Sequence, residues 1–254
     1  MKLIDVAALR AKSTDSPSLR RLVIGIAAAM VSGVTLVAPA LLAPGTTAVA
    51  SAAPGGCPDV QVVFARGTGE PVGVGRVGDA FVEALRPLVG GKSIGVYAVN
   101  YPATRDFLRA ADGANDASNF VQNTVANCPD TKIVLGGYSQ GAAVIDAIAV
   151  ATAPELGFTQ VMPASVADHV AAVAVFGNPS IRLLGGPLTA LSPLYGYKTI
   201  DLCNGADPVC STGNDVPAHS LYVEAGLATQ AAQFVGSRLT TEAPISSAAA
   251  QTHG

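Results

Sequence analysis

The pentapeptide Gly137-Tyr138-Ser139-Gln140-Gly141 gives its serine the surroundings that a nucleophilic serine needs. It follows the apolar run Lys132–Gly137, a predicted strand, and precedes the Ala-rich run Gln140–Ala151, a predicted helix. The spacing matches G-x-S-x-G, in which a sharp strand-to-helix turn presents the serine hydroxyl. We therefore expect Ser139 at the carboxyl edge of a sheet and at a helix N-terminus, where the helix dipole favours developing negative charge.

A serine hydroxyl is a weak nucleophile and needs a neighbouring base. Three histidines are available, and two of them are poorly placed. His169 precedes the predicted strand Val170–Phe176 and so lies at the amino edge of the sheet, while His253 lies close to the C-terminus. His219 follows the last predicted strand, so its loop can reach the edge that carries Ser139. We predict that His219 is the general base.

The acid that orients the histidine should lie between the serine and the histidine in the chain. Asp201 falls inside a predicted strand, where it should point into a helix layer or pair locally, and Asp215 has the position of a loop or capping residue. Asp207 lies just beyond the strand, in a loop flanked by Cys203 and Cys210 that a disulfide would hold still. We predict that Asp207 fixes the imidazole tautomer and stabilises the imidazolium.

Two donors are needed for the oxyanion that forms during acyl transfer. One should be the backbone N–H of Gln140, the residue after the nucleophile. The other should come from the loop Arg66–Glu70 after the first predicted strand, where Thr68 offers both an N–H and a hydroxyl. The alternative for this loop is an ordinary glycine-rich turn, but it is no phosphate-binding loop because no Gly-Lys-Ser/Thr follows.

The elements that must position these residues alternate between strands and helices. Such alternation predicts an α/β fold with a mostly parallel sheet covered by helices on both faces. Trp is absent, so we expect a core of Val, Ala, Leu and Ile. The predicted strands span residues 60–65, 93–99, 132–137, 170–176 and 197–202, and the predicted helices span 78–89, 107–126 (broken near Gly113), 140–151 and 219–239.

The charge distribution excludes some classes of partner. The formal net charge is −3, but residues 1–52 hold five basic and two acidic residues, which leaves 10 basic and 16 acidic residues in the remainder. The remainder contains no Lys/Arg cluster, so we expect no nucleic-acid binding and no strong attraction to anionic membranes.

The first 52 residues have the features of an export signal. Arg20-Arg21 precedes an apolar run to about residue 43, and Ala48-Val49-Ala50 and Ala50-Ser51-Ala52 both fit a small-residue cleavage site. We predict a signal peptide over 1–52, with a retained N-terminal anchor as the alternative, and a secreted or cell-wall-associated protein. Residues 53–240 should form one domain, and 241–254 a flexible tail.

Four cysteines follow the predicted signal peptide. An even number in an exported chain suggests two disulfides among three pairings. No Cys-x-x-Cys pair occurs and the histidines are scattered, so we expect no metal and no cofactor.

Four segments, taken in order along the chain, resemble the motifs of the cutinase family. They are Phe64-Ala65-Arg66-Gly67-Thr68, the Ser139 pentapeptide with Ala142, Asp207-Pro208-Val209-Cys210, and His219. The resemblance extends from about Cys57 to Leu239 and is strongest to the cutinase-like secreted esterases of mycobacteria and related actinobacteria. It implies a small α/β-hydrolase with a central five-stranded parallel sheet and no large lid. It also implies disulfides Cys57–Cys128 and Cys203–Cys210, a Ser139–Asp207–His219 triad, and an oxyanion hole at Thr68 and Gln140.

The resulting hypothesis is a secreted, monomeric serine esterase or lipase that cleaves short- to medium-chain acyl esters and contacts lipid interfaces transiently. The alternatives are a phospholipase A or thioesterase with the same triad, and a non-enzymatic lipid- or wall-binding protein. Loops Gly69–Val77 and Gly177–Tyr195 should shape the acyl cleft. Five leucines could give it an exposed apolar rim or could simply pack within their loop: Leu183, Leu184, Leu188, Leu191 and Leu194.

Overall fold

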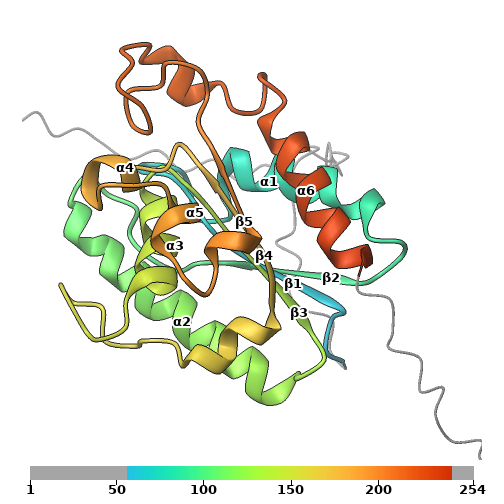
Figure 1. Cartoon of the computed structure of the whole chain (residues 1–254). Coiled ribbons are helices and arrows are strands. Elements are labelled where there is room, and N and C mark those ends of the chain that lie inside the picture. Colours follow the sequence, from blue (N-terminus) through green and yellow to red (C-terminus); the bar gives the residue numbers. More distant parts are fainter. Residues whose placement is uncertain (1–55, 242–254) are drawn as a thin grey trace, which may run out of the picture. The chain divides into compact units, whose positions relative to one another are not determined.

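The computed structural model describes residues 56–241, so the predicted signal peptide, His253 and most of the predicted tail lie outside it. A five-stranded sheet with the order β2-β1-β3-β4-β5 occupies the centre, and every neighbouring pair of strands is parallel (Figure 1). The strands are β1 (Val60–Ala65), β2 (Ile94–Ala98), β3 (Lys132–Tyr138), β4 (Val170–Phe176) and β5 (Thr199–Leu202).

Helices cover both faces of the sheet, as the alternating pattern predicted. Helices α1 and α6 pack side by side on one face, and α2 and α3 pack together on the other (Figure 1). Two short helices, α4 and α5, connect β4 with β5. The helices are α1 (Gly75–Leu85), α2 (Ala110–Asn127), α3 (Gln140–Val150), α4 (Ser180–Leu183), α5 (Leu188–Leu191) and α6 (Leu227–Thr241). Within 56–241, no helix combines the length and apolarity needed to cross a membrane.

The core differs on the two faces. Valine, alanine, leucine and isoleucine dominate the α2/α3 side, as expected from the composition. On the α1/α6 side the expectation is incomplete, because Phe64, Phe81 and Phe176 form a buried aromatic cluster with ring centroids 6.1–6.3 Å apart. Side chains buried on both faces of one sheet account for the nearly continuous apolar strands β1 and β4.

Several predicted boundaries were wrong. The first helix spans Gly75–Leu85 rather than 78–89, because Arg86–Leu88 form a separate 3₁₀ helix. The last helix begins at Leu227 rather than His219, because Pro217–Ser220 form a separate 3₁₀ helix and Gly226 (φ +73°) separates it from α6. Strand β5 begins at Thr199 because residues 196–198 form a 3₁₀ turn. Helix α2 continues through Gly113, where a Cβ would lie 3.0 Å from atoms of Tyr101 and Val144, so this glycine permits close packing rather than a break.

Parallel strands place their carboxyl ends at one edge of the sheet. The register pairs Ala65 with Gly137, Tyr138 with Phe176, and Phe176 with Leu202. The segments that follow these strands therefore emerge together: the Arg66–Glu70 loop, Ser139, Gly177 and the Cys203–Cys210 loop. This edge contains most of the residues that the sequence selected for chemistry.

Candidate active site

Ser139 lies on a sharp turn between β3 and α3. Its backbone has φ +55° and ψ −116°, a conformation that a residue other than glycine rarely adopts. The Ser139 N–H donates to the Phe176 carbonyl oxygen (2.9 Å), and the Ser139 carbonyl oxygen accepts from the Ala142 N–H (2.9 Å). These bonds tie the turn both to the neighbouring strand and to the helix, as a strand–turn–helix nucleophile requires.

The glycines of the pentapeptide have the steric role that the sequence suggested. A Cβ at Gly141 would lie 2.0 Å from the Ala65 carbonyl oxygen, and one at Gly137 would lie 2.2 Å from the Gly141 carbonyl oxygen. Both obstacles are backbone atoms, which cannot move aside as a flexible side chain can. The absence of a side chain at Gly141 therefore lets the turn approach β1, and its absence at Gly137 lets the turn close on itself.

The structure brings Ser139, His219 and Asp207 together. The His219 Nε2 atom lies 2.9 Å from the Ser139 Oγ atom, and the His219 Nδ1 atom lies 2.7 Å from the Asp207 Oδ2 atom. Asp207 is fully buried, whereas the His219 side chain is 21% exposed. An imidazole between a hydroxyl and a buried carboxylate can take a proton from the hydroxyl while the carboxylate stabilises the resulting imidazolium.

The loop that holds Asp207 is closed by a disulfide between Cys203 and Cys210, and a second disulfide joins Cys57 to Cys128. The Asp207 Oδ1 atom accepts the Val209 N–H (2.8 Å). The Asp207 carbonyl oxygen accepts the Ser211 hydroxyl (2.7 Å).

The remaining candidates lie where the sequence argument placed them. His169 lies at the opposite edge, with its Nδ1 atom 3.0 Å from the Pro129 carbonyl oxygen. Asp201 is partly buried and accepts hydrogen bonds from Asn178 and from the Leu188 N–H. Asp215 accepts the Ala218 N–H (3.3 Å) as a local cap.

Thr68 and Gln140 meet beside Ser139. The Thr68 hydroxyl donates to the Gln140 Oε1 atom (3.2 Å), and the Gln140 Nε2 atom donates to the Thr104 carbonyl oxygen (3.0 Å). Gln140 is also the first residue of α3, where backbone N–H groups have no partner within the helix. The Gln140 N–H is thus a donor next to the serine, and the Thr68 side chain lies against the same residue.

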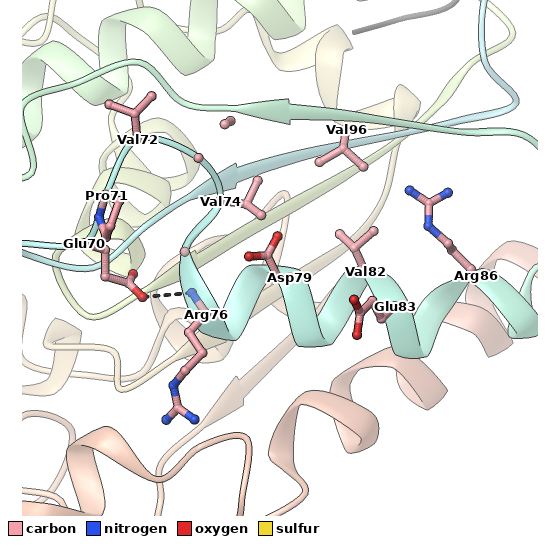
Figure 2. Close-up of a pocket in the computed structure, with 13 residues that line it drawn as sticks. Glu70, Pro71, Val72, Val74, Arg76, Asp79, Val82, Glu83, Arg86 and Val96 are labelled. Carbon is pink, nitrogen blue, oxygen red and sulfur yellow. Dashed lines mark hydrogen bonds between the residues drawn. The ribbon is translucent and has the colours of Figure 1, made fainter. Parts of the chain in front are cut away.

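Glu70 braces the loop that carries Thr68. Its Oε2 atom accepts the Gly67 N–H (2.6 Å), and its Oε1 atom accepts the Arg76 N–H (2.9 Å) in the first turn of α1 (Figure 2). The Arg66 guanidinium donates to the Glu70 carbonyl oxygen (3.0 Å) and to the Tyr101 carbonyl oxygen (2.6 Å). The sequence gives no sign of either role, because the partners of both side chains are backbone atoms, which leave no pattern of residue types.

Two tyrosines contact the His219 ring, and no sequence pattern indicates either contact. The Tyr138 ring stacks on the imidazole with centroids 5.2 Å apart, and the Tyr138 hydroxyl donates to the His219 carbonyl oxygen. Burial, reinforced by the charges of Glu70 and Asp207, raises the pKa of Tyr138 to about 12. Tyr222 meets the imidazole edge to face and donates its hydroxyl to the Asp207 Oδ2 atom (2.7 Å).

One hollow lies beside α1 and another beside α3, and Ser139 lines neither of them. The larger, of about 610 Å³, lies between residues 70–75, α1 and β2, and mixes valines with Asp79, Glu83 and Arg86 (Figure 2). The smaller, of about 220 Å³, is an apolar groove beside α3 that Leu183 and Leu184 help to line. Of the five leucines considered for an exposed rim, Leu183, Leu184 and Leu194 are exposed, Leu191 is partly buried and Leu188 is fully buried in the core.

The fold and this serine–histidine–carboxylate arrangement define an α/β-hydrolase of the serine type. The cutinase family model matches residues 56–239. Phospholipase Culp4 of Mycobacterium tuberculosis is 56% identical over 220 residues, which cover 87% of this chain and 92% of that protein. Carboxylesterase Culp1 of Mycobacterium bovis is 51% identical over 207 residues, covering 76% and 91% respectively.

Solved structures agree with this assignment. A Trichoderma reesei cutinase bound to a phosphonate inhibitor matches with a TM-score of 0.59 at 33% identity, covering 72% of this chain and 78% of that one. The catalytic core domain of acetyl xylan esterase from Trichoderma reesei matches with a TM-score of 0.61 at 27% identity, covering 72% and 100%. The chain belongs to the cutinase family, and it is a carboxylic ester hydrolase.

Proposed function

We propose that Ser139, His219 and Asp207 carry out ester hydrolysis through an acyl-enzyme, on short- to medium-chain acyl esters. The observation that carries the proposal is the continuous chain of contacts from the Ser139 hydroxyl through His219 to the buried Asp207 carboxylate. His219 takes the Ser139 proton as the Oγ atom attacks the ester carbonyl carbon. The tetrahedral intermediate then expels the alcohol, which receives the proton from His219.

The second half of the reaction repeats these steps with water. His219 removes a proton from water, the hydroxide attacks the acyl carbon, and the bond to the Ser139 Oγ atom breaks as His219 returns the proton. In both halves the negative oxygen would be stabilised by the backbone N–H groups of Gln140 and Thr68. The Thr68 hydroxyl, whose one hydrogen points to the Gln140 Oε1 atom, would add a third donor by rotating toward the oxyanion. Removing one such donor typically costs roughly 3 kcal/mol of transition-state stabilisation.

A phospholipid ester is the second candidate substrate, because the 56% identical relative Culp4 is named a phospholipase. The same triad would cleave it without a change in mechanism, so the distinction lies in substrate binding. We also propose that the enzyme is exported, as the sequence of residues 1–52 indicates, that residues 53–240 form a single domain, and that it acts as a monomer.

A substrate profile tests this proposal. Hydrolysis rates would be measured for p-nitrophenyl esters from acetyl to palmitoyl, for a phosphatidylcholine and for an acyl-CoA, each with the Ser139→Ala variant as the control. We expect the highest kcat/KM with acyl chains of short to medium length and no turnover by Ser139→Ala. A preference for phosphatidylcholine would favour the second candidate. Equal turnover by Ser139→Ala would exclude the mechanism for both.

A further inference from the structure

The hydroxyl of Tyr222 lies in the interior, among polar atoms of the loop that holds Asp207. It lies 2.7 Å from the Asp207 Oδ2 atom, 3.1 Å from the Asn204 nitrogen and 3.3 Å from the Cys210 Sγ atom. The Tyr222 side chain is fully buried. The Asn204 N–H can only donate, and a disulfide sulfur is a far weaker acceptor than a carboxylate oxygen, so the tyrosine hydrogen points to Asp207.

The Asp207 carboxylate has few other partners. Its Oδ1 atom accepts the Val209 N–H, and its Oδ2 atom faces both the His219 Nδ1 atom and the Tyr222 hydroxyl. Because Asp207 is fully buried, water cannot replace a missing donor without moving the loop. Without the Tyr222 hydroxyl, only the imidazole would fix the oxygen that orients it.

Tyr222 is held in place independently of Asp207. Its ring packs edge to face on Phe176, with an interplanar angle of 89° and centroids 6.2 Å apart. Its carbonyl oxygen accepts the Leu227 N–H (3.0 Å) at the start of α6. A Cβ at Gly177 (φ +55°) would lie 2.9 Å from the His219 Cε1 atom and 3.1 Å from the Tyr222 hydroxyl, so β4 ends against both residues.

We propose that Tyr222 is a positioning residue for the esterase reaction: its hydroxyl fixes the Asp207 carboxylate so that Oδ2 faces His219. This inference rests on the proposed function, since it assigns Tyr222 a role through the triad. A donor shared with the imidazole also withdraws negative charge from Oδ2 and so moderates the attraction of the carboxylate for a protonated His219. Tyr222 would therefore act on both the orientation and the basicity of the histidine.

The test compares Tyr222→Phe with a matched control, Tyr97→Phe. Tyr97, on β2, donates its hydroxyl to the Asp116 carboxylate on α2 (2.9 and 3.0 Å), so the control removes the same kind of bond away from the triad. Hydrogen bonds to charged groups are strong enough to change a rate roughly 10-fold or more. We expect Tyr222→Phe to lower kcat about 10-fold with little change in KM, whereas Tyr97→Phe retains the wild-type kcat.

The pH profile separates positioning from a general loss of structure. Without the hydroxyl, Oδ2 carries more negative charge and stabilises the imidazolium more strongly, so the acidic limb of kcat/KM should move to higher pH in Tyr222→Phe. A purely structural role would scale the profile without moving the limb. A folded Tyr222→Phe variant whose acidic limb does not move would overturn the inference, whether kcat keeps its wild-type value or falls.

A second variant keeps the inference testable if Tyr222→Phe does not fold. Site-specific 3-fluorotyrosine at position 222 preserves the ring and makes the hydroxyl a stronger donor, so the acidic limb should move to lower pH. An unmoved limb would overturn the inference as well. Ser139→Ala tests the proposed function separately. If that variant is inactive while changes at Tyr222 have no effect, the triad stands and only the role of Tyr222 is refuted.

Discussion

The buried carboxyl of Asp146 on α3 provides a pH-dependent prediction. Its side chain is 3% exposed, and its Oδ1 atom accepts a hydrogen bond from the Asn178 Nδ2 atom (3.0 Å), which also donates to Asp201 (3.2 Å). Burial is the largest influence and raises the pKa of Asp146 to about 7, partly opposed by the bond from Asn178. We predict that Asp146→Asn, which imitates the protonated carboxyl, stabilises the fold at neutral and alkaline pH.

The size of the effect follows from the two pKa values. The unfolded chain releases this proton near the ordinary aspartate pKa of 3.8, whereas the folded protein retains it until the pH reaches about 7. The folded state therefore binds more protons in this window, and the free energy of unfolding falls as the pH rises through it. The free energy of unfolding falls by at most about 4 kcal/mol. The whole decrease is present above the folded-state pKa, and none of it is present below the unfolded-state pKa.

Urea unfolding at several pH values measures this effect. The free energy of unfolding would be compared for the wild type, Asp146→Asn and the exposed control Asp106→Asn between pH 4 and pH 8. We expect the variant to match the wild type near pH 4 and to exceed it by up to about 4 kcal/mol at pH 8. Parallel pH dependence in the wild type and Asp146→Asn would show that Asp146 is ionised in the folded protein, contrary to the reasoning.

Three further changes have defined expected results. Asp207→Asn should lower kcat about 10⁴-fold while the circular dichroism spectrum stays unchanged, because the amide favours the wrong imidazole tautomer; a loss below tenfold would contradict that role. Gly141→Ala should lower the free energy of unfolding by about 1–3 kcal/mol, seen as a lower melting temperature, or prevent folding, because its Cβ would lie 2.0 Å from the Ala65 carbonyl oxygen. An unchanged melting temperature would refute this steric clash. Replacing Cys57 and Cys128 by serine opens a loop with a sequence separation of 71 and should cost about 4 kcal/mol in urea unfolding, with no loss of kcat in the variant that remains folded.

Much of the fold could be predicted from local sequence patterns. Strand β1 was predicted with its observed boundaries, because continuous apolar runs between turn residues are typical of buried parallel strands. Ser139 was recognisable because the glycines beside it meet a steric requirement that can be seen within five residues. His219 and Asp207 followed from the rule that the carboxyl ends of parallel strands meet at one edge.

The partners of these residues could not be predicted, because they depend on tertiary contacts. Tyr222 lies three residues after His219 in a segment that was predicted to be helical, and only the 3₁₀ turn and Gly226 bring its hydroxyl to Asp207. Glu70 reaches Gly67 and Arg76 through side chain–backbone bonds that leave no periodic pattern. The exposed leucines posed a similar problem, because composition does not distinguish buried Leu188 from exposed Leu183.

The most direct test of the central claim is covalent labelling of Ser139 by a fluorophosphonate, which reacts with an activated serine hydroxyl. The wild type, Ser139→Ala and a surface control, Ser237→Ala on the exposed side of α6, would be labelled in parallel and analysed by intact-protein mass spectrometry. The proposed mechanism predicts one label per chain in the wild type and in Ser237→Ala, none in Ser139→Ala, and loss of ester hydrolysis in proportion to labelling. Stoichiometric labelling of Ser139→Ala, or full hydrolysis by the labelled wild type, would contradict it.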